Sequence, residues 1–361
     1  MRSASLILLL TCSALAGPTT APTSAPALHS RAEHLRVQEL SGKASDLIAR
    51  HKFPEAEKCL NDAIAIIPDD TTCLYDLAVV YAVTRRPDDA LNLLLRATDA
   101  GFTDFTQIES NPAFNSLWDL PRFQDLLGRK DQIRHHAAER IEEDLKRRFG
   151  EHYLYRIDEP HKLVFAAHVE QTALDEMVKM LQTEERSQAE EIFSHLRDEF
   201  LRVIVASPVD FAKREQRYGV AGRYDDSTRT LLVKSAGAEL RHEFTHAIHA
   251  ADQHALGQEH PVWLSEGLAT LYENPSAGAD DRMIPGDNWR LARVQAAARH
   301  DTLIPLDKLL KMNREEFTSR AELAYGEAGS LLLYLYEHQL LKKFYDAYTA
   351  GYAKDSTGRD A

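Results

Sequence analysis

The sequence predicts a helical N-terminal region followed by a mixed α+β domain. Three observations lead to this prediction: a self-similarity of period 34 from about Leu40, a set of short apolar runs between residues 153 and 234, and a His-Glu-x-x-His run at residues 242–246. The first is typical of stacked pairs of helices, the second of strands joined by short turns, and the third of a helix that binds a metal ion.

Length and charge limit the classes of protein to which the chain can belong. Its 361 residues are enough for two or three domains, and 44% hydrophobic and 27% charged residues are ordinary for a globular protein. Lys and Arg number 43 and Asp and Glu 56, which gives a formal net charge of −13. This acidic balance argues against a nucleic acid as the partner and against a general attraction to anionic membranes.

Residues 1–16 have the features of a secretory signal peptide. Arg2 supplies a positive charge, an apolar run follows it, and Ala14 and Ala16 form an A-x-A cleavage site. The apolar run is too short to span a bilayer, and no other run approaches 18 residues. We therefore expect an exported protein, periplasmic or extracellular, without a transmembrane segment.

Cys12 offers an alternative, because the residues before it loosely match the site at which lipoproteins are cleaved and acylated. Thr11 fits that pattern poorly, so we favour cleavage after Ala16 over a lipid anchor on Cys12. Residues 17–35 begin with a Pro/Thr/Ala-rich stretch, and we expect them to form a flexible tether.

The period of 34 residues places small and large apolar residues in register within residues 36–128. The matching pairs are Leu40 with Leu74, Ala44 with Ala78, Leu47 with Tyr81, Ala56 with Ala90, Leu60 with Leu94, and Ala63 with Ala97. Alanines let two antiparallel helices approach closely, and this pattern resembles tetratricopeptide repeats. Pro112 would fall inside a helix of a third copy, so we expect two repeats. They serve either as a scaffold or as a surface that binds a protein partner.

The rest of the chain is expected to form a connecting helix, residues 129–150, a domain over residues 151–352, and a disordered tail, residues 353–361. Gly150 should end the connecting helix. The expected elements of the domain are strands at 153–157, 163–167, 201–206, 220–224 and 228–234 and helices at 172–181, 187–200, 289–298 and 315–319.

The His-Glu-x-x-His run places two imidazoles on one face of a helix. His242 and His246 are four residues apart, so both can bind one metal ion, and Glu243 is near enough to act on a water molecule there. A catalytic zinc ion needs a third protein ligand and an open fourth position. Glu266, in the run Trp-Leu-Ser-Glu-Gly after a turn, is the candidate for that ligand.

These two motifs resemble those of the gluzincin metallopeptidases, the MA-clan enzymes that include thermolysin-like and M1-aminopeptidase-like proteins. The resemblance implies a zincin-like two-lobed fold, Zn²⁺ bound by His242, His246 and Glu266, and Glu243 as the general base in peptide-bond hydrolysis. It also implies that the strand before the metal-binding helix is a sheet edge to which a peptide or protein substrate adds as a further strand.

Two further stretches bear on the activity. Tyr325 lies in a run that resembles the helix whose tyrosine stabilises the oxyanion in such enzymes, although packing in the core is the alternative. Residues 222–226 lack the glutamate with which M1 aminopeptidases bind the substrate's amino group, so we favour an endopeptidase. The alternative function is a non-catalytic peptide-binding or scaffolding protein with a structural or vestigial zinc site.

Several residues have roles that the sequence leaves open. Thr270, one turn after Glu266, could accept a hydrogen bond from a ligating histidine. His249 could support the site, but a position on the helix surface is favoured. Cys59 and Cys73 could form a disulfide or remain thiols.

Overall fold

The computed structural model describes residues 30–217, 220–278, 282–286 and 289–361. The expected signal peptide, its alternative at Cys12 and residues 17–29 of the expected tether lie outside these residues. The chain divides into two compact units, Met1–Pro68 and Asp69–Ala361. The division falls between the two expected repeats, so the second repeat belongs to the same unit as the expected peptidase domain.

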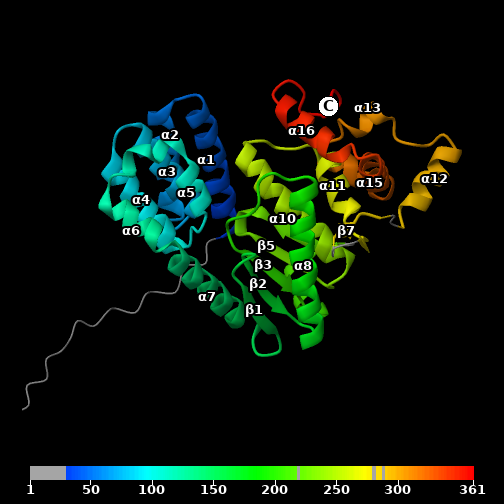
Figure 1. The fold of residues 1–361 in the computed structure, drawn as a ribbon, viewed down its shortest axis with the longest axis horizontal. Helices are drawn as coiled ribbons and strands as arrows, with labels where there is room; N and C mark the ends of the chain where they lie inside the picture. Colours follow the sequence, from blue (N-terminus) through cyan, green and yellow to red (C-terminus); the bar gives the residue numbers. More distant parts are fainter. Residues whose placement is uncertain (1–29, 218–219, 279–281, 287–288) are drawn as a thin grey trace, which may run out of the picture. The chain divides into compact units, whose positions relative to one another are not determined.

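The first unit contains a helical hairpin formed by α1 (Arg31–Ala49) and α2 (Phe53–Ile66) (Figure 1). Helix α1 starts with a capping box: the Ser30 Oγ accepts from the Glu33 backbone N–H at 3.2 Å, and the Glu33 carboxylate accepts from the Ser30 N–H at 2.6 Å. Such a box satisfies two backbone donors at a helix start. The prediction of a tether up to residue 35 is therefore wrong for residues 31–35, which are helical.

The second unit starts with another helical hairpin, α3 (Thr71–Val83) and α4 (Pro87–Ala100). The period of 34 residues is confirmed as a pattern of burial, because both members of four matching pairs are 0% exposed. These pairs are Ala44 and Ala78, Ala56 and Ala90, Leu60 and Leu94, and Ala63 and Ala97. The same side-chain positions thus form the interior of each hairpin.

Shorter helices follow the second hairpin. They are α5 (Phe105–Ser110), the 3₁₀ helix η1 (Pro112–Leu117) and α6 (Pro121–Gly128), and they precede the long helix α7 (Lys130–Phe149). Pro112 starts η1, as expected of a residue that cannot lie inside a third repeat helix. Gly150 ends α7 with a φ of 72°, a conformation that glycine adopts readily.

A five-stranded mixed sheet forms the centre of the second unit. Its strands are β1 (Leu154–Asp158), β2 (Leu163–Ala167), β3 (Leu201–Val205), β4 (Gly222–Asp225) and β5 (Thr230–Val233). Their order is β1-β2-β3-β5-β4, with β2, β3 and β5 parallel and the two edge strands antiparallel to their neighbours. The strand before the metal-binding helix is β5, which is internal. The expectation that this strand is the sheet edge is wrong, because β4 folds back outside it.

Helices cover both faces of this sheet (Figure 1). One set of alternate strand residues, including Phe165, Val203 and Leu231, packs with residues of α8 (Gln171–Glu191) and of the helices that follow β5. The other set, including Val164 and Ile204, packs with residues of α7. The central strands are apolar on both faces for this reason.

The region after α8 differs from the expectation of two helices at 172–181 and 187–200. One helix, α8, runs to Glu191, and residues 192–200 are not helical. Asp252 accepts hydrogen bonds from the backbone N–H groups of Ser194 and His195, at 3.2 and 3.0 Å. These two N–H groups therefore have an acceptor that is not a helix carbonyl, and α8 ends before them.

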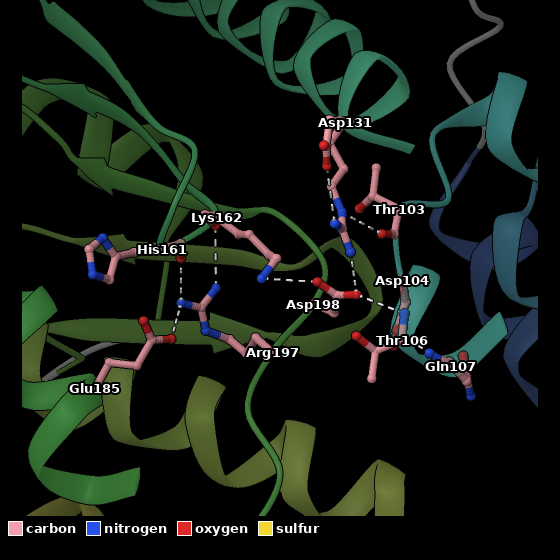
Figure 2. Close-up of polar contacts among 11 residues, drawn as sticks. Thr103, Asp104, Thr106, Gln107, Asp131, His161, Lys162, Glu185, Arg197 and Asp198 are labelled. Atoms are coloured by element: carbon pink, nitrogen blue, oxygen red, sulfur yellow. Dashed lines mark hydrogen bonds and ion pairs between the residues drawn. The ribbon is translucent and has the colours of Figure 1, made fainter. Parts of the chain in front are cut away.

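Asp198, in this non-helical stretch, joins the helical segment to the sheet (Figure 2). Its Oδ2 accepts from the backbone N–H of Thr106 in α5 at 2.9 Å and from Arg134 Nη2 of α7 at 2.6 Å. Its Oδ1 lies 2.9 Å from Lys162 Nζ, at the start of β2. The Asp198 side chain is 9% exposed, so these three donors replace water around a buried carboxylate.

The remaining helices of the unit complete its described part. They are α9 (Pro208–Arg214), α10 (Ala238–Leu256), α11 (Val262–Leu271), α12 (Leu291–Arg299), α13 (Leu306–Leu309), α14 (Arg314–Ser319), α15 (Ala321–Glu337) and α16 (Leu341–Gly351). A two-stranded sheet of β6 (Ser276–Ala277) and β7 (Met283–Ile284) and the 3₁₀ helix η2 (Asp226–Thr228) complete the described elements. In the described part of the chain, no helix has both the length and the hydropathy that crossing a bilayer requires.

The tail, residues 353–361, is not disordered as expected. The carbonyl of Thr357 accepts from the Trp263 indole at 2.9 Å, and the carbonyl of Ser356 accepts from the Tyr348 hydroxyl at 3.2 Å. Asp355 organises this turn by accepting from the backbone N–H groups of Thr357 and Asp360. Two buried aromatic residues therefore find their polar partners in the tail.

Candidate metal centre

Helix α10 carries both histidines of the His-Glu-x-x-His run. Its apolar side chains, among them Leu240, Phe244 and Ile248, are fully buried against the sheet. The spacing of four residues puts His242 and His246 on one face, with their ring centroids 4.8 Å apart. The side chains of His242 and His246 are 13% and 16% exposed.

Helix α11 brings Glu266 to the two histidines. The chain turns at Gly257, which ends α10, and returns with an almost wholly buried helix. The Glu266 Oε2 lies 3.3 Å from the Nε2 of His242 and 3.3 Å from the Nε2 of His246, and the two Nε2 atoms are 3.2 Å apart. The structure thus brings together the three residues that the sequence predicts as ligands, and they could bind a metal ion.

The spacing of these three atoms fits a tetrahedral metal site. Zinc bonds to histidine nitrogen and carboxylate oxygen are about 2.0–2.1 Å long, which places neighbouring ligands of a tetrahedron about 3.3–3.4 Å apart. The observed separations of 3.2–3.3 Å are close to this value. Two imidazoles and one carboxylate are also a ligand set that catalytic zinc sites use.

Glu273 contacts the ring nitrogen of His242 that does not face Glu266. Its Oε1 lies 2.9 Å from the Nδ1 of His242, and Arg290 contacts its other oxygen. Burial opposes charge on both partners. The hydrogen bonds to Glu266 and Glu273 nevertheless raise the pKa of His242 to about 10, and the bond from His242 together with Arg290 lowers the pKa of Glu273. An acceptor on Nδ1 leaves Nε2 directed at the metal position.

The sequence prediction named Thr270 for this supporting role and missed Glu273. Thr270 is fully buried, but the acceptor for His242 is Glu273. Glu273 lies two residues beyond the end of α11 at Leu271, where the chain has left the helix, so helical spacing from Glu266 does not predict the contact.

Arg314 contacts the third ligand from outside the helix pair. Its Nη1 lies 3.0 Å from the Glu266 Oε1, at the start of α14. Glu266 is 3% exposed. Its burial opposes ionisation, but His246, His242 and their hydrogen bonds hold the pKa of Glu266 well below its usual range. No spacing in the sequence links residues 266 and 314.

Glu243 lies beside the edge strand β4. A Cβ atom added to Gly222 of that strand would lie 3.0 Å from the Glu243 Cγ and 3.4 Å from its Oε1. A side chain at position 222 would therefore displace Glu243. Because Gly222 has no side chain, strand β4 can lie directly against the Glu243 carboxylate.

Tyr325 of α15 lies beside the histidine pair. Its ring stacks on that of His242 with a centroid distance of 6.1 Å, and Phe317 packs against it at 5.1 Å. Burial, followed by the charge of Glu266, raises the pKa of the Tyr325 hydroxyl, so it stays protonated and able to donate a hydrogen bond. The structure thus places the predicted tyrosine next to the ligand group.

His249 is not the surface residue that the sequence interpretation favoured. It is 1% exposed and packs between the rings of Phe193 and Tyr345. Its Nε2 lies 2.7 Å from the Nδ1 of His260, itself buried, and its Nδ1 lies 3.4 Å from the Ser265 Oγ. Burial lowers the pKa of His249 well below its usual range and that of His260 to about 4, and both rings pack against Tyr345 of α16.

Comparison with protein-family models, curated proteins and solved structures gave no match to this chain.

Proposed function

We propose that the protein is a zinc-dependent peptidase of the gluzincin kind, with a zincin-like domain over residues 151–352. The observation that carries the proposal is the triangle of His242 Nε2, His246 Nε2 and Glu266 Oε2, with sides of 3.2–3.3 Å. Three protein ligands leave a fourth position for water or substrate, which distinguishes a catalytic zinc site from a closed structural one.

A bound zinc ion would polarise the scissile carbonyl and lower the pKa of its water towards about 7. Glu243 is the general base that takes a proton from the attacking water and passes it to the leaving amine. Tyr325 donates a hydrogen bond to the carbonyl oxygen as negative charge develops there. Glu273 keeps His242 oriented.

Strand β4 is the part of the sheet that would bind the substrate backbone. It is an edge strand and lies against Glu243, and an edge strand can pair with an added peptide. An extended peptide on β4 would pass the general base, which favours an endopeptidase. We further propose that the protein is exported by residues 1–16 and that the helical repeats bind or position a protein partner.

Substitution of Glu243 by Gln tests this function. The Gln side chain keeps the shape of Glu243 but cannot accept the proton, and loss of a general base typically costs 10²- to 10⁴-fold in rate. We expect the full chain to bind about one zinc ion and to cleave members of a diverse peptide mixture, measured by mass spectrometry with and without a chelator. Glu243→Gln should retain the zinc and lose nearly all cleavage.

Two further variants complete the experiment. His246→Ala should lose zinc, because one of three ligands is removed. Glu239→Gln, one turn before Glu243 on α10 and bound to Ser235, is the matched control and should cleave at the wild-type rate. Zinc bound without any cleavage in the wild type would instead favour the non-catalytic alternative, and equal rates in wild type and Glu243→Gln would refute the proposed role of Glu243.

A further inference from the structure

Arg314 combines two properties that rarely occur together in one side chain. Its guanidinium lies 3.0 Å from the buried Glu266, yet 70% of its side-chain surface is exposed, against 4% for the Glu266 side chain. By contrast Arg290, which contacts Glu273, is only 16% exposed. Arg290 thus belongs to the interior that supports the histidine, whereas Arg314 reaches the ligand group from the solvent side.

Glu266 uses its two oxygens for different partners. Oε2 faces the two histidines and Oε1 faces Arg314. If Oε2 binds the metal ion, the carboxylate of Glu266 lies between the ion and Arg314. The charge of Arg314 also lowers the pKa of the Tyr325 hydroxyl, which burial and Glu266 raise.

The balance of charge around the ligand group favours an anion there. Arg290 and Glu273 compensate each other within the interior. A divalent cation would take up the charge of Glu266, and Glu243 carries one further negative charge. The divalent cation, Glu266 and Glu243 would then sum to zero, so Arg314 would leave one positive charge uncompensated and partly exposed. A guanidinium has five N–H donors, of which one contact to Glu266 uses few.

We infer that Arg314 binds a carboxylate of the substrate next to the bond that is cleaved. This inference rests on the proposed peptidase function and adds a substrate class to it: peptides with an acidic group near the scissile bond. The carboxylate could be the C-terminus of a short peptide or an Asp or Glu side chain. Arginine pairs with carboxylates through two parallel hydrogen bonds in either case.

Binding of peptidyl hydroxamates to the zinc-loaded full chain tests the inference without relying on turnover. Four compounds share one backbone, in which the hydroxamate binds the metal ion. The first ends in a free carboxylate and the second in a carboxamide; the third and fourth both end in a carboxamide and carry an Asp or an Asn side chain. Affinities are measured by titration calorimetry, and zinc content is measured for each protein.

We expect one carboxylate compound to bind the wild type about 10- to 100-fold more tightly than its neutral match, as a charge-assisted hydrogen bond allows. A preference for the first over the second assigns the substrate C-terminus, and a preference for the third over the fourth assigns an acidic side chain. In Arg314→Ala the preference should fall to about 1-fold, while the neutral compounds and zinc bind as before. Arg314→Lys should keep part of it.

Arg293→Ala is the matched control, because Arg293 is an exposed arginine of the nearby α12 that pairs with Glu322 and not with a ligand. It should keep the full preference. Equal binding of acidic and neutral compounds to the wild type, or a preference that survives in Arg314→Ala, would overturn the inference. The inference would also be overturned if Arg314→Ala lost zinc and bound all four compounds more weakly by the same factor. Arg314 would then act only by positioning Glu266. Failure of every hydroxamate to bind zinc-loaded wild type would overturn the proposed peptidase function as well.

Discussion

Glu184 is a carboxyl group without any exposed surface, in α8 beside the metal-binding helix. Its Oε1 accepts from Gln188 Nε2 at 3.0 Å and from Thr245 Oγ1 at 3.1 Å, and Arg241 is the nearest cation, 3.9 Å from Oε2. Among the described residues, Oε2 and the Gln188 Oε1 have no hydrogen-bond partner. Burial dominates these contacts and raises the pKa of Glu184 to about 8.

The raised pKa predicts that stability falls as the pH rises. Below about pH 4.5 Glu184 is protonated in both the folded and the unfolded chain. Between pH 4.5 and 8 the unfolded chain loses the proton first, so the free energy of unfolding decreases, by up to about 1.4 kcal/mol for each unit of pKa difference. Glu184→Gln removes this dependence and should raise the melting temperature more at pH 8 than at pH 5.

Thermal unfolding at the two pH values, with a chelator present, checks the prediction. Glu190→Gln is the matched control, because Glu190 lies on the same helix and is exposed; it should change the melting temperature equally little at both pH values. A Glu184→Gln variant that is less stable than wild type at pH 8 would show that the buried carboxyl is ionised and held by Arg241.

At the scale of elements, the packing of α11 on α15 sets the distance between Glu266 and Tyr325. Gly267, the residue after the ligand, lies at the contact: a Cβ there would be 2.9 Å from the Leu332 Cδ1 and 3.1 Å from the Ala328 carbonyl oxygen. The first distance is shorter than Cβ contacts in proteins, and the second is tighter than most of them. A side chain at position 267 would therefore shift Leu332 and press on the backbone of α15.

Gly267→Ala should destabilise the second unit by about 1–3 kcal/mol, the usual cost of overpacking a core. The backbone of α15 must move away from α11, because the contact with Ala328 is to main-chain atoms. Chemical denaturation measures the loss. Gly351→Ala provides the control, since nothing lies within 4 Å of the added Cβ, and it should change stability by less than about 1 kcal/mol. Equal effects of the two substitutions would contradict the steric argument.

The sequence could predict the two histidines from their spacing on one helix, and Glu266 from the motif that contains it. His242 and His246 share a face because they are four residues apart, and the repeat period predicted which alanines are buried. Contacts between elements outside these motifs left no such signal. Arg314 meets Glu266, and Gly222 meets Glu243, only because α14 and β4 fold back onto the metal-binding helices.

The errors have the same origin. Strand β4 is the edge because it folds back outside β5, which strand patterns cannot reveal. Residues 194 and 195 leave the expected helix because Asp252, more than fifty residues later, binds their backbone N–H groups. His249 is buried because Phe193 and Tyr345 cover it. In each case a tertiary contact overrides a local preference.

At the scale of the whole molecule, Asp198 links the helices before the sheet to the sheet itself. It joins α5 and α7 to the start of β2 through Thr106, Arg134 and Lys162. Burial opposes its charge, but the backbone N–H of Thr106 and the ammonium of Lys162 hold the pKa of Asp198 below its usual value. Its contribution to stability is therefore present at neutral pH and lost as the pH falls through the folded-state pKa.

Asp198→Asn should lower the free energy of unfolding by about 3 kcal/mol at pH 7, because two half-buried cations lose their buried charged partner. Glu109→Gln is the control: Glu109 pairs with Lys130 in the same helical segment, but both side chains are more than a third exposed, so its loss should cost less than about 1 kcal/mol. Chemical denaturation measures the free energy of unfolding of both variants. Hydrogen exchange then tells whether the weakening is shared: amides of α7 and of β2 should lose protection together in Asp198→Asn, because one carboxylate contacts Arg134 of α7 and Lys162 directly before β2. Loss of protection in α7 alone would show that the helical segment unfolds independently of the sheet.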